Sequence, residues 1–220
     1  MTPEVSTALQ RLDSILPLVA GLRSLSDEDA MLYCKLLNSY VQQGRTLTRD
    51  EVAGFVSNAD QALANIVDSK LIVLDTDGNP AGAYPFTSEE REHKVHINGV
   101  TAHCMCALDA LSVSCMFNTP TVIDSQCRVT EAPIHLEQNG TSFSGGTLNA
   151  WFGINWGAAA SDTACSASLC MEMMFLANES VAQDWLAESP DTREIFGLPS
   201  AVEFAAGFFV PLAENCRQAA

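Results

Sequence analysis

The chain has 220 residues, of which 27 are acidic and 11 are basic, so its formal net charge at neutral pH is −16. A surface of this sign repels the phosphates of nucleic acids and the headgroups of anionic lipids, which argues against both classes of partner. Because 47% of the residues are hydrophobic, the chain can bury a core as one large domain or as two small ones.

Neither a membrane span nor a secretory signal is predicted. The apolar run at residues 15–22 ends at Arg23 and is well short of the roughly 20 residues that a transmembrane helix needs. The first residues, Met1 to Glu4, lack the basic start and the apolar middle of a signal peptide. We therefore expect a cytoplasmic protein.

Eight cysteines are expected to be thiols in such a compartment, because a chain of this size does not need disulfides to fold. For most of them the simplest interpretation is a small buried hydrophobic side chain. This interpretation is applied to Cys34, Cys115, Cys165 and Cys216, and Cys127 is also interpreted as structural.

Residues 1–90 are predicted to form helices followed by a two-stranded hairpin, an arrangement similar to a winged helix. Ser26 with Asp29, and Thr48 with Glu51, have the spacing of helix capping boxes, and an Asp-Gly turn at residues 75–79 separates two β-prone runs. This segment carries six basic and thirteen acidic side chains, the wrong balance for DNA binding. We interpret it as a packing module and not as a DNA-binding one.

Residues 91–220 are predicted to form the catalytic domain, with a mainly antiparallel sheet and flanking helices, so the whole chain is expected to be α+β. Strands are predicted at 92–98, 121–123, 126–129 and 133–136, and helices at 102–117, 181–188 and 201–214. The uncharged segment 138–161 is expected to contribute strands and loops around a pocket.

The candidate site centres on Cys106 and Asp109, three residues apart, together with the distant Cys170. On a helix, Cys106 and Asp109 share a face while Cys104 points elsewhere. In an extended segment, Cys104 and Cys106 share a face and could chelate a metal together. High helix propensity around Leu108 favours the first geometry.

The segment Cys106-Ala107-Leu108-Asp109 resembles the Cys-Ala-Leu-Asp signature of the organomercurial (alkylmercury) lyases. Other short motifs of that family follow in the same order along most of the chain. They are Gly44 to Arg49, Asp77-Gly78-Asn79, Ser125-Gln126-Cys127, Cys170, Phe175, Asp184-Trp185 and Phe196-Gly197-Leu198. The chain departs from the family pattern at Met105, where Trp is usual, at His103-Cys104, which replaces an aromatic and a small residue, and at Met171, where a second Cys is frequent.

The resemblance implies cleavage of the carbon–mercury bond of an organomercury substrate. Cys106 would capture the mercury, Cys170 would be the second thiolate ligand, and Asp109 would deliver a proton to the leaving carbon. Soft sulfur suits mercury. Asp109 would either rest protonated, if burial raises its pKa, or take a proton from a thiol first.

No cofactor is implied beyond free thiols for turnover, and the mercury would bind Cys106, Cys170 and Asp109 as substrate or product. Cellular thiols or a mercuric reductase would then remove the mercuric ion.

Three other interpretations stay open. The chain could sequester Cu⁺ or Hg²⁺ on Cys104, Cys106 and Cys170 without cleavage, or it could act on a different substrate with the same fold. A zinc site is a weaker hypothesis and uses His93, His96, His103 and Cys104. Methionines near the site are interpreted as core filling more readily than as pocket lining.

Overall fold

The structure is a computed structural model, and it describes residues 1–160 and 163–218. Residues 161 and 220, which end the predicted pocket segment and the predicted catalytic domain, lie outside the described residues. In the described part of the chain the helices are α1 (Pro3–Ile15), α2 (Leu18–Ser24), α3 (Asp27–Gln43), α4 (Arg49–Ala53), α5 (Ala59–Asp68), α6 (Ala107–Phe117), α7 (Glu179–Ala187) and α8 (Leu198–Gln218). None of these helices has both the length and the apolar character needed to cross a membrane.

The strands form two antiparallel sheets in the described part of the chain. The larger sheet has the order β1-β2-β3-β5-β4-β6-β7-β8, and the smaller has the order β10-β9-β11. Their bounds are β1 (Ile72–Leu74), β2 (Pro80–Ala83), β3 (Phe86–Thr87), β4 (Lys94–Ile97), β5 (Val100–Cys104), β6 (Thr121–Gln126), β7 (Pro133–Asn139), β8 (Ser142–Gly146), β9 (Trp151–Asn155), β10 (Met173–Leu176) and β11 (Arg193–Gly197). The predicted α+β class is confirmed.

The capping signals of the N-terminal part are found where the sequence places them. Thr48 and Glu51 form a complete capping box at α4, and the Ser26 side chain accepts a hydrogen bond from the Asp29 N–H at the start of α3. The predicted hairpin is β1 with β2, and β3 continues it into the larger sheet. The division of the chain at residue 90 stays a prediction.

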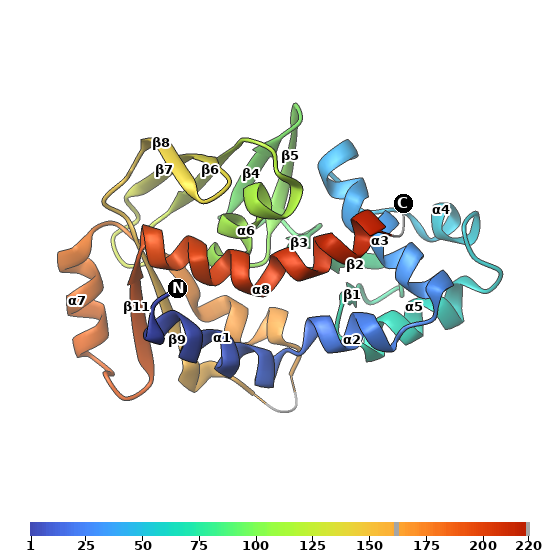
Figure 1. Ribbon diagram of the computed structural model, residues 1–220, viewed down its shortest axis with the longest axis horizontal. Coiled ribbons are helices and arrows are strands. Elements are labelled where there is room, and N and C mark those ends of the chain that lie inside the picture. The colour runs from blue at the N-terminus through green and yellow to red at the C-terminus, as the bar shows by residue number, and fades with distance from the viewer. Residues whose placement is uncertain (161–162, 219–220) are drawn as a thin grey trace.

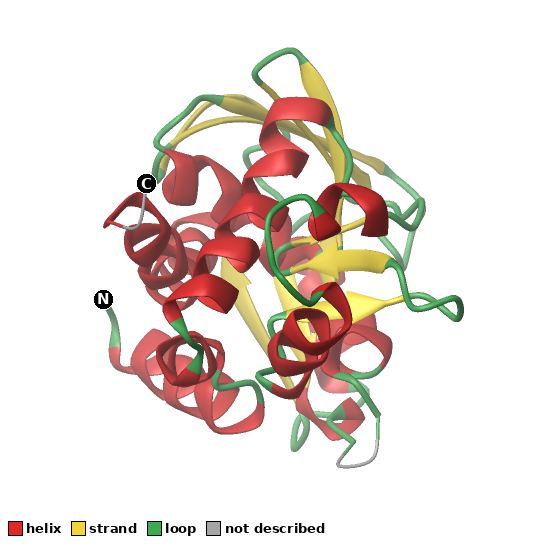
Figure 2. Ribbon diagram, turned by 90° about the vertical axis from the view of Figure 1, so that its right-hand side faces the viewer, coloured by secondary structure: helices red, strands yellow, loops and turns green. Residues whose placement is uncertain are grey.

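Helix α8 crosses the middle of the molecule, with α1 along one side and α6 on the other (Figure 1). Helices fill the left and lower parts of the view in Figure 2, and strands run over its top and right. Helix α6 is buried nearly all round, and its sequence is mostly apolar with no continuous polar face. Buried residues of all these elements belong to one hydrophobic cluster.

Three local predictions were wrong. The segment 102–117 is not one helix, since residues up to Cys104 belong to β5 and the helix begins at Ala107. The predicted strand 126–129 is mostly a tight turn, in which the Cys127 N–H donates to the Ala132 carbonyl and the Glu131 N–H donates to the Cys127 carbonyl. The first difference arises because β5 pairs with β3 and β4, a contact between segments that helix propensity does not register. The second arises because β-prone residues at a chain reversal are also suited to a strand.

The third correction concerns Cys34 and Cys216, which form a disulfide and are not free thiols. Their burial was predicted, but the partner of each lies 182 residues away in the sequence. Helix α3 and the end of α8 lie side by side, and this brings the two Cα atoms within 5.2 Å (Figure 1). Helical periodicity identifies a buried face but cannot identify which distant helix covers it.

Candidate active site

Cys106 is the N-cap residue of α6, immediately after the chain leaves β5. Its Sγ accepts a hydrogen bond from the Asp109 N–H at 3.4 Å, as a serine or threonine oxygen does in an ordinary cap. The side chain is only 1% exposed. The first turn of a helix presents free N–H groups and a partial positive charge, so this position favours a sulfur atom that becomes negative.

Asp109 is in the first turn of the same helix and is also 1% exposed. Both carboxyl oxygens are buried and neither has a hydrogen-bond partner. Burial raises the pKa of Asp109 to about 7, although the neighbouring Cys106 side chain and the charge of Arg91 act in the opposite direction. Near neutral pH this carboxyl group is therefore suited to both accept and donate a proton.

Cys170 reaches the same place from the short helix η3 (Leu169–Glu172) and is 3% exposed. One ligand atom from each of Cys106, Asp109 and Cys170 lies within 4.8 Å of the other two. Among the described residues, no other group of three metal-ligating side chains is this close. The structure thus brings together the three residues that the sequence singled out.

The two thiols are protonated at rest. Burial raises the pKa of Cys106 to about 11, partly offset by the neighbouring Cys170 side chain. The adjacent Cys106 and Cys165 side chains, together with burial, raise the pKa of Cys170 well above its usual value. A soft metal that binds here must therefore displace two protons, and Asp109 is the adjacent group that can accept one.

Two arginines hold the segment that carries Cys170. Nη1 of Arg91 donates to the Met105 carbonyl at 2.9 Å and to the Ser166 carbonyl at 3.1 Å, so a single guanidinium group joins the segments of both cysteines. Arg128 donates to the Met171 carbonyl and also binds Glu92. The sequence analysis missed both residues, because a donor to backbone carbonyls leaves no motif.

Two further sulfur atoms surround the site. The Cys106 thiol donates to Sδ of Met173 at 3.6 Å, and the Sγ atoms of Cys165 and Cys170 are 3.6 Å apart. Met173 therefore lines the site, whereas Met171 is 42% exposed. Cys165 was interpreted as core filling, but it is only partly buried. The spacing of five residues between Cys165 and Cys170 was the sequence feature that could have indicated that the two thiols lie together.

The residues of the alternative metal sites are dispersed. Cys104 ends β5, fully buried, and does not belong to the group formed by Cys106, Asp109 and Cys170. His93 is hydrogen-bonded to Ser125, His96 to Thr101 and Asp124, and His103 to the Arg91 backbone. In the part of the chain that the structure describes, the predicted zinc ligands form no cluster. Cys127 is buried beside Phe175, as a structural residue would be.

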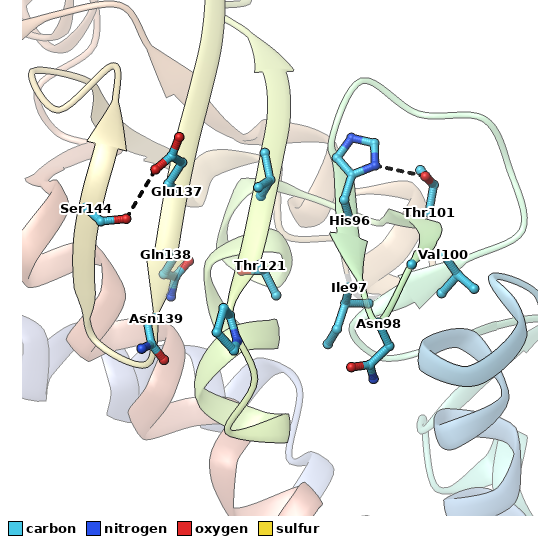
Figure 3. Close-up of a pocket in the computed structure, with 13 residues that line it drawn as sticks. His96, Ile97, Asn98, Val100, Thr101, Thr121, Glu137, Gln138, Asn139 and Ser144 are labelled. Carbon is cyan, nitrogen blue, oxygen red and sulfur yellow. Dashed lines mark hydrogen bonds between the residues drawn. The ribbon is translucent and has the colours of Figure 1, made fainter.

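Cavities elsewhere in the molecule have different chemistry. One of about 560 Å³ lies over β4 to β8 and is lined by polar groups such as His96, Thr101, Glu137 and Ser144 (Figure 3). Figure 3 shows the His96–Thr101 and Glu137–Ser144 hydrogen bonds across its walls. None of its lining residues is a cysteine, so this cavity is separate from the sulfur site.

Two buried thiols beside an unpartnered carboxyl group have the chemistry that a soft metal ion prefers in its ligands. The profile of the alkylmercury lyase family, MerB, matches residues 86–210, which are 125 of the 220 residues. The chain therefore belongs to the alkylmercury lyase family.

A solved structure gives the same result for the fold. The chain is similar to the crystal structure of the mercury-bound form of MerB2, with a TM-score of 0.71 and 18% sequence identity over 90% of this chain and 98% of that one. At this identity the likeness shows a shared fold. No curated protein sequence matches the chain.

Proposed function

We propose that this protein is an organomercurial lyase that cleaves the carbon–mercury bond by protonolysis, releasing a hydrocarbon and leaving Hg(II) on Cys106 and Cys170. The proposal depends on one observation: Asp109 is buried without a partner for either oxygen and lies within 4.8 Å of both thiols. A buried carboxyl group without partners is costly, so its retention is explained by a ligand that it serves.

In the first step, an organomercury thiolate exchanges its thiolate for Cys106. A bond from Sγ to mercury forms, the original sulfur–mercury bond breaks, and the Cys106 proton leaves with the released thiol. Because the pKa of Cys106 is about 11, the proton and the incoming mercury exchange places without a free thiolate at rest. Sγ at the helix N-terminus is positioned to carry partial negative charge during this exchange.

In the second step, the Asp109 carboxylate accepts the Cys170 proton as Cys170 binds mercury. Two thiolates then donate electron density through mercury to the carbon atom. Asp109 returns the proton to that carbon, the carbon–mercury bond breaks, and the hydrocarbon leaves. One thiol proton thus ends on the released thiol and the other on the hydrocarbon. A positioned acid of this kind contributes a factor of roughly 10²–10⁴ in rate.

Free thiols are the only co-reactants that this scheme needs. An excess of cellular thiol, or the cysteine pair of a mercuric reductase, would take the product Hg(II) from the two cysteines. A cytoplasmic location would supply thiols in excess and is part of the same proposal.

Phenylmercury with excess thiol tests the function, with benzene as the measured product. We expect benzene from the wild-type protein, and its loss in Cys106→Ser and in Asp109→Ala. Cys115→Ser is a matched control, because Cys115 is a partly buried thiol on the same helix but outside the site. Benzene should also survive in Cys104→Ser.

One outcome would replace the proposal by metal sequestration. If the wild-type protein binds mercury tightly, releases no benzene, and loses binding in Cys104→Ser, the protein stores the metal and does not cleave. Mercury binding that depends on Cys106 and Cys170, accompanied by benzene release, supports the lyase.

A further inference from the structure

A second cavity lies next to the sulfur site and has Cys165 in its wall. Its volume is about 710 Å³, and most of its lining is apolar, with Tyr84 and Lys70 among its polar groups. Cys106, Asp109 and Cys170 are not among its lining residues. Cys165 therefore connects the two, because it lies in the cavity wall and its Sγ contacts that of Cys170.

The three cysteines form a series from the interior to the cavity. Cys170 contacts Cys165 at 3.6 Å on one side, and on the other side it groups with Cys106 and the unpartnered Asp109. Cys106 and Cys170 are 1% and 3% exposed, whereas Cys165 is only partly buried. A thiol dissolved in water can reach Cys165 through the cavity more readily than it can reach either deeper sulfur.

Resting on the proposed function, we propose that Cys165 is a relay thiol, which takes Hg(II) from the buried pair and passes it to thiols that enter the cavity. This role concerns product release and not bond cleavage. It explains why a third cysteine lies in sulfur–sulfur contact with Cys170, where a merely apolar residue would fill the space equally well.

The exchange is balanced without any oxidant or reductant. Sγ of Cys165 bonds to the mercury held by Cys106 and Cys170, the bond from mercury to Cys106 breaks, and the proton of Cys165 ends on Cys106. Two molecules of external thiol then replace Cys165 and Cys170 on mercury, and their protons return to the two cysteines. At each stage mercury keeps two thiolate ligands.

The segment between Cys165 and Cys170 is held in place while mercury is exchanged between them. Arg91 binds the Ser166 carbonyl and Arg128 binds the Met171 carbonyl, one on each side of Cys170. Cys165 precedes this fixed stretch and begins the short helix η2 (Cys165–Ala167), whose neighbour Ala164 is exposed in the cavity wall. Mercury can therefore pass from Cys170, whose segment is fixed, to Cys165, which is only partly buried.

The test measures release of Hg(II) alone, so that it does not depend on lyase activity. Reduced protein is loaded with one equivalent of mercuric chloride, freed of excess metal, and mixed with a small monothiol, and loss of the mercury–thiolate ultraviolet absorption is followed in time. We expect Cys165→Ser and Cys165→Ala to release mercury at least tenfold more slowly than the wild-type protein. Cys115→Ser, the matched control, should release it at the wild-type rate.

Release from both Cys165 variants at the wild-type rate would overturn the relay. A second measurement guards against a folding defect, since a single turnover with phenylmercury should give the wild-type amount of benzene in both variants while repeated turnover slows. If the wild-type protein yields no benzene but its mercury release still depends on Cys165, the proposed lyase function fails and the relay stands. Slow release combined with loss of mercury binding would also overturn the relay.

Discussion

The replacement Asp109→Asn should stabilise the protein at neutral and alkaline pH, because it removes a carboxyl group whose ionisation the folded state disfavours. The folded pKa is about 7 against an ordinary value of 3.8, a difference of about 3 units. Each unit corresponds to about 1.4 kcal/mol. Above pH 7 the buried charge therefore costs about 4 kcal/mol of stability, as an order of magnitude.

The sign of the pH dependence follows from proton binding. At pH 5 the folded protein holds a proton on Asp109 while the unfolded chain does not, so stability falls as pH rises until the folded group also ionises near pH 7. Between pH 5 and pH 8 the wild-type protein should lose about 3 kcal/mol relative to Asp109→Asn. Urea unfolding of both proteins at the two pH values measures this difference.

A control separates burial from a general effect of charge. Asp191 is an exposed carboxylate, so Asp191→Asn makes the same chemical change at the surface and is measured at the same two pH values as the control. If Asp109→Asn shows the same free energy of unfolding relative to wild type at pH 5 and pH 8, Asp109 is not a buried carboxyl group with a raised pKa. The reasoning about its proton transfers would then be refuted.

Two further predictions use the positioning arginine and the disulfide. In the wild type, the rate of a single phenylmercury turnover should rise with pH to a midpoint near 7, the pKa of Asp109. Arg91→Met removes a charge that lowers this pKa, so the midpoint should move to higher pH. A lower rate with an unchanged midpoint would show that Arg91 acts only by holding the backbone. Cys216→Ser opens a loop of 182 residues and should lower the free energy of unfolding by about 5 kcal/mol in the chain-entropy account. Denaturation of the wild type after selective reduction of Cys34 and Cys216 should match the variant, and equal stability of oxidised and reduced protein would contradict this expectation.

Much of the fold was predictable because its signals are local. The capping box at Thr48 and Glu51, and the strand predicted at 92–98 and found as β4, depend only on residues a few positions apart. The disulfide and the order of strands in the larger sheet depend on contacts between distant segments. Periodicity carries no information about such partners.

The grouping of Cys106, Asp109 and Cys170 was predictable from the sequence, but the geometry of the group was not. Cys106 and Asp109 were expected to share a helix face, yet Cys106 is the cap and Asp109 is the third residue of the helix. Their spacing is that of a capping box in which sulfur replaces a hydroxyl oxygen. Arg91 and Cys165 were missed, because each acts on Cys170 or its segment across space and neither belongs to a recognisable motif.

The bond between Cys34 and Cys216 closes nearly the whole chain into a covalent ring. A protease that cuts the chain once inside this ring, for example in the hairpin turn at Asn139 and Gly140, produces two pieces that cannot diffuse apart. The nicked protein would keep its full mass on a non-reducing gel and separate into two bands only after reduction. As long as the disulfide is intact, such a cut would thus leave the segments of Cys106 and Cys170 attached to the same molecule.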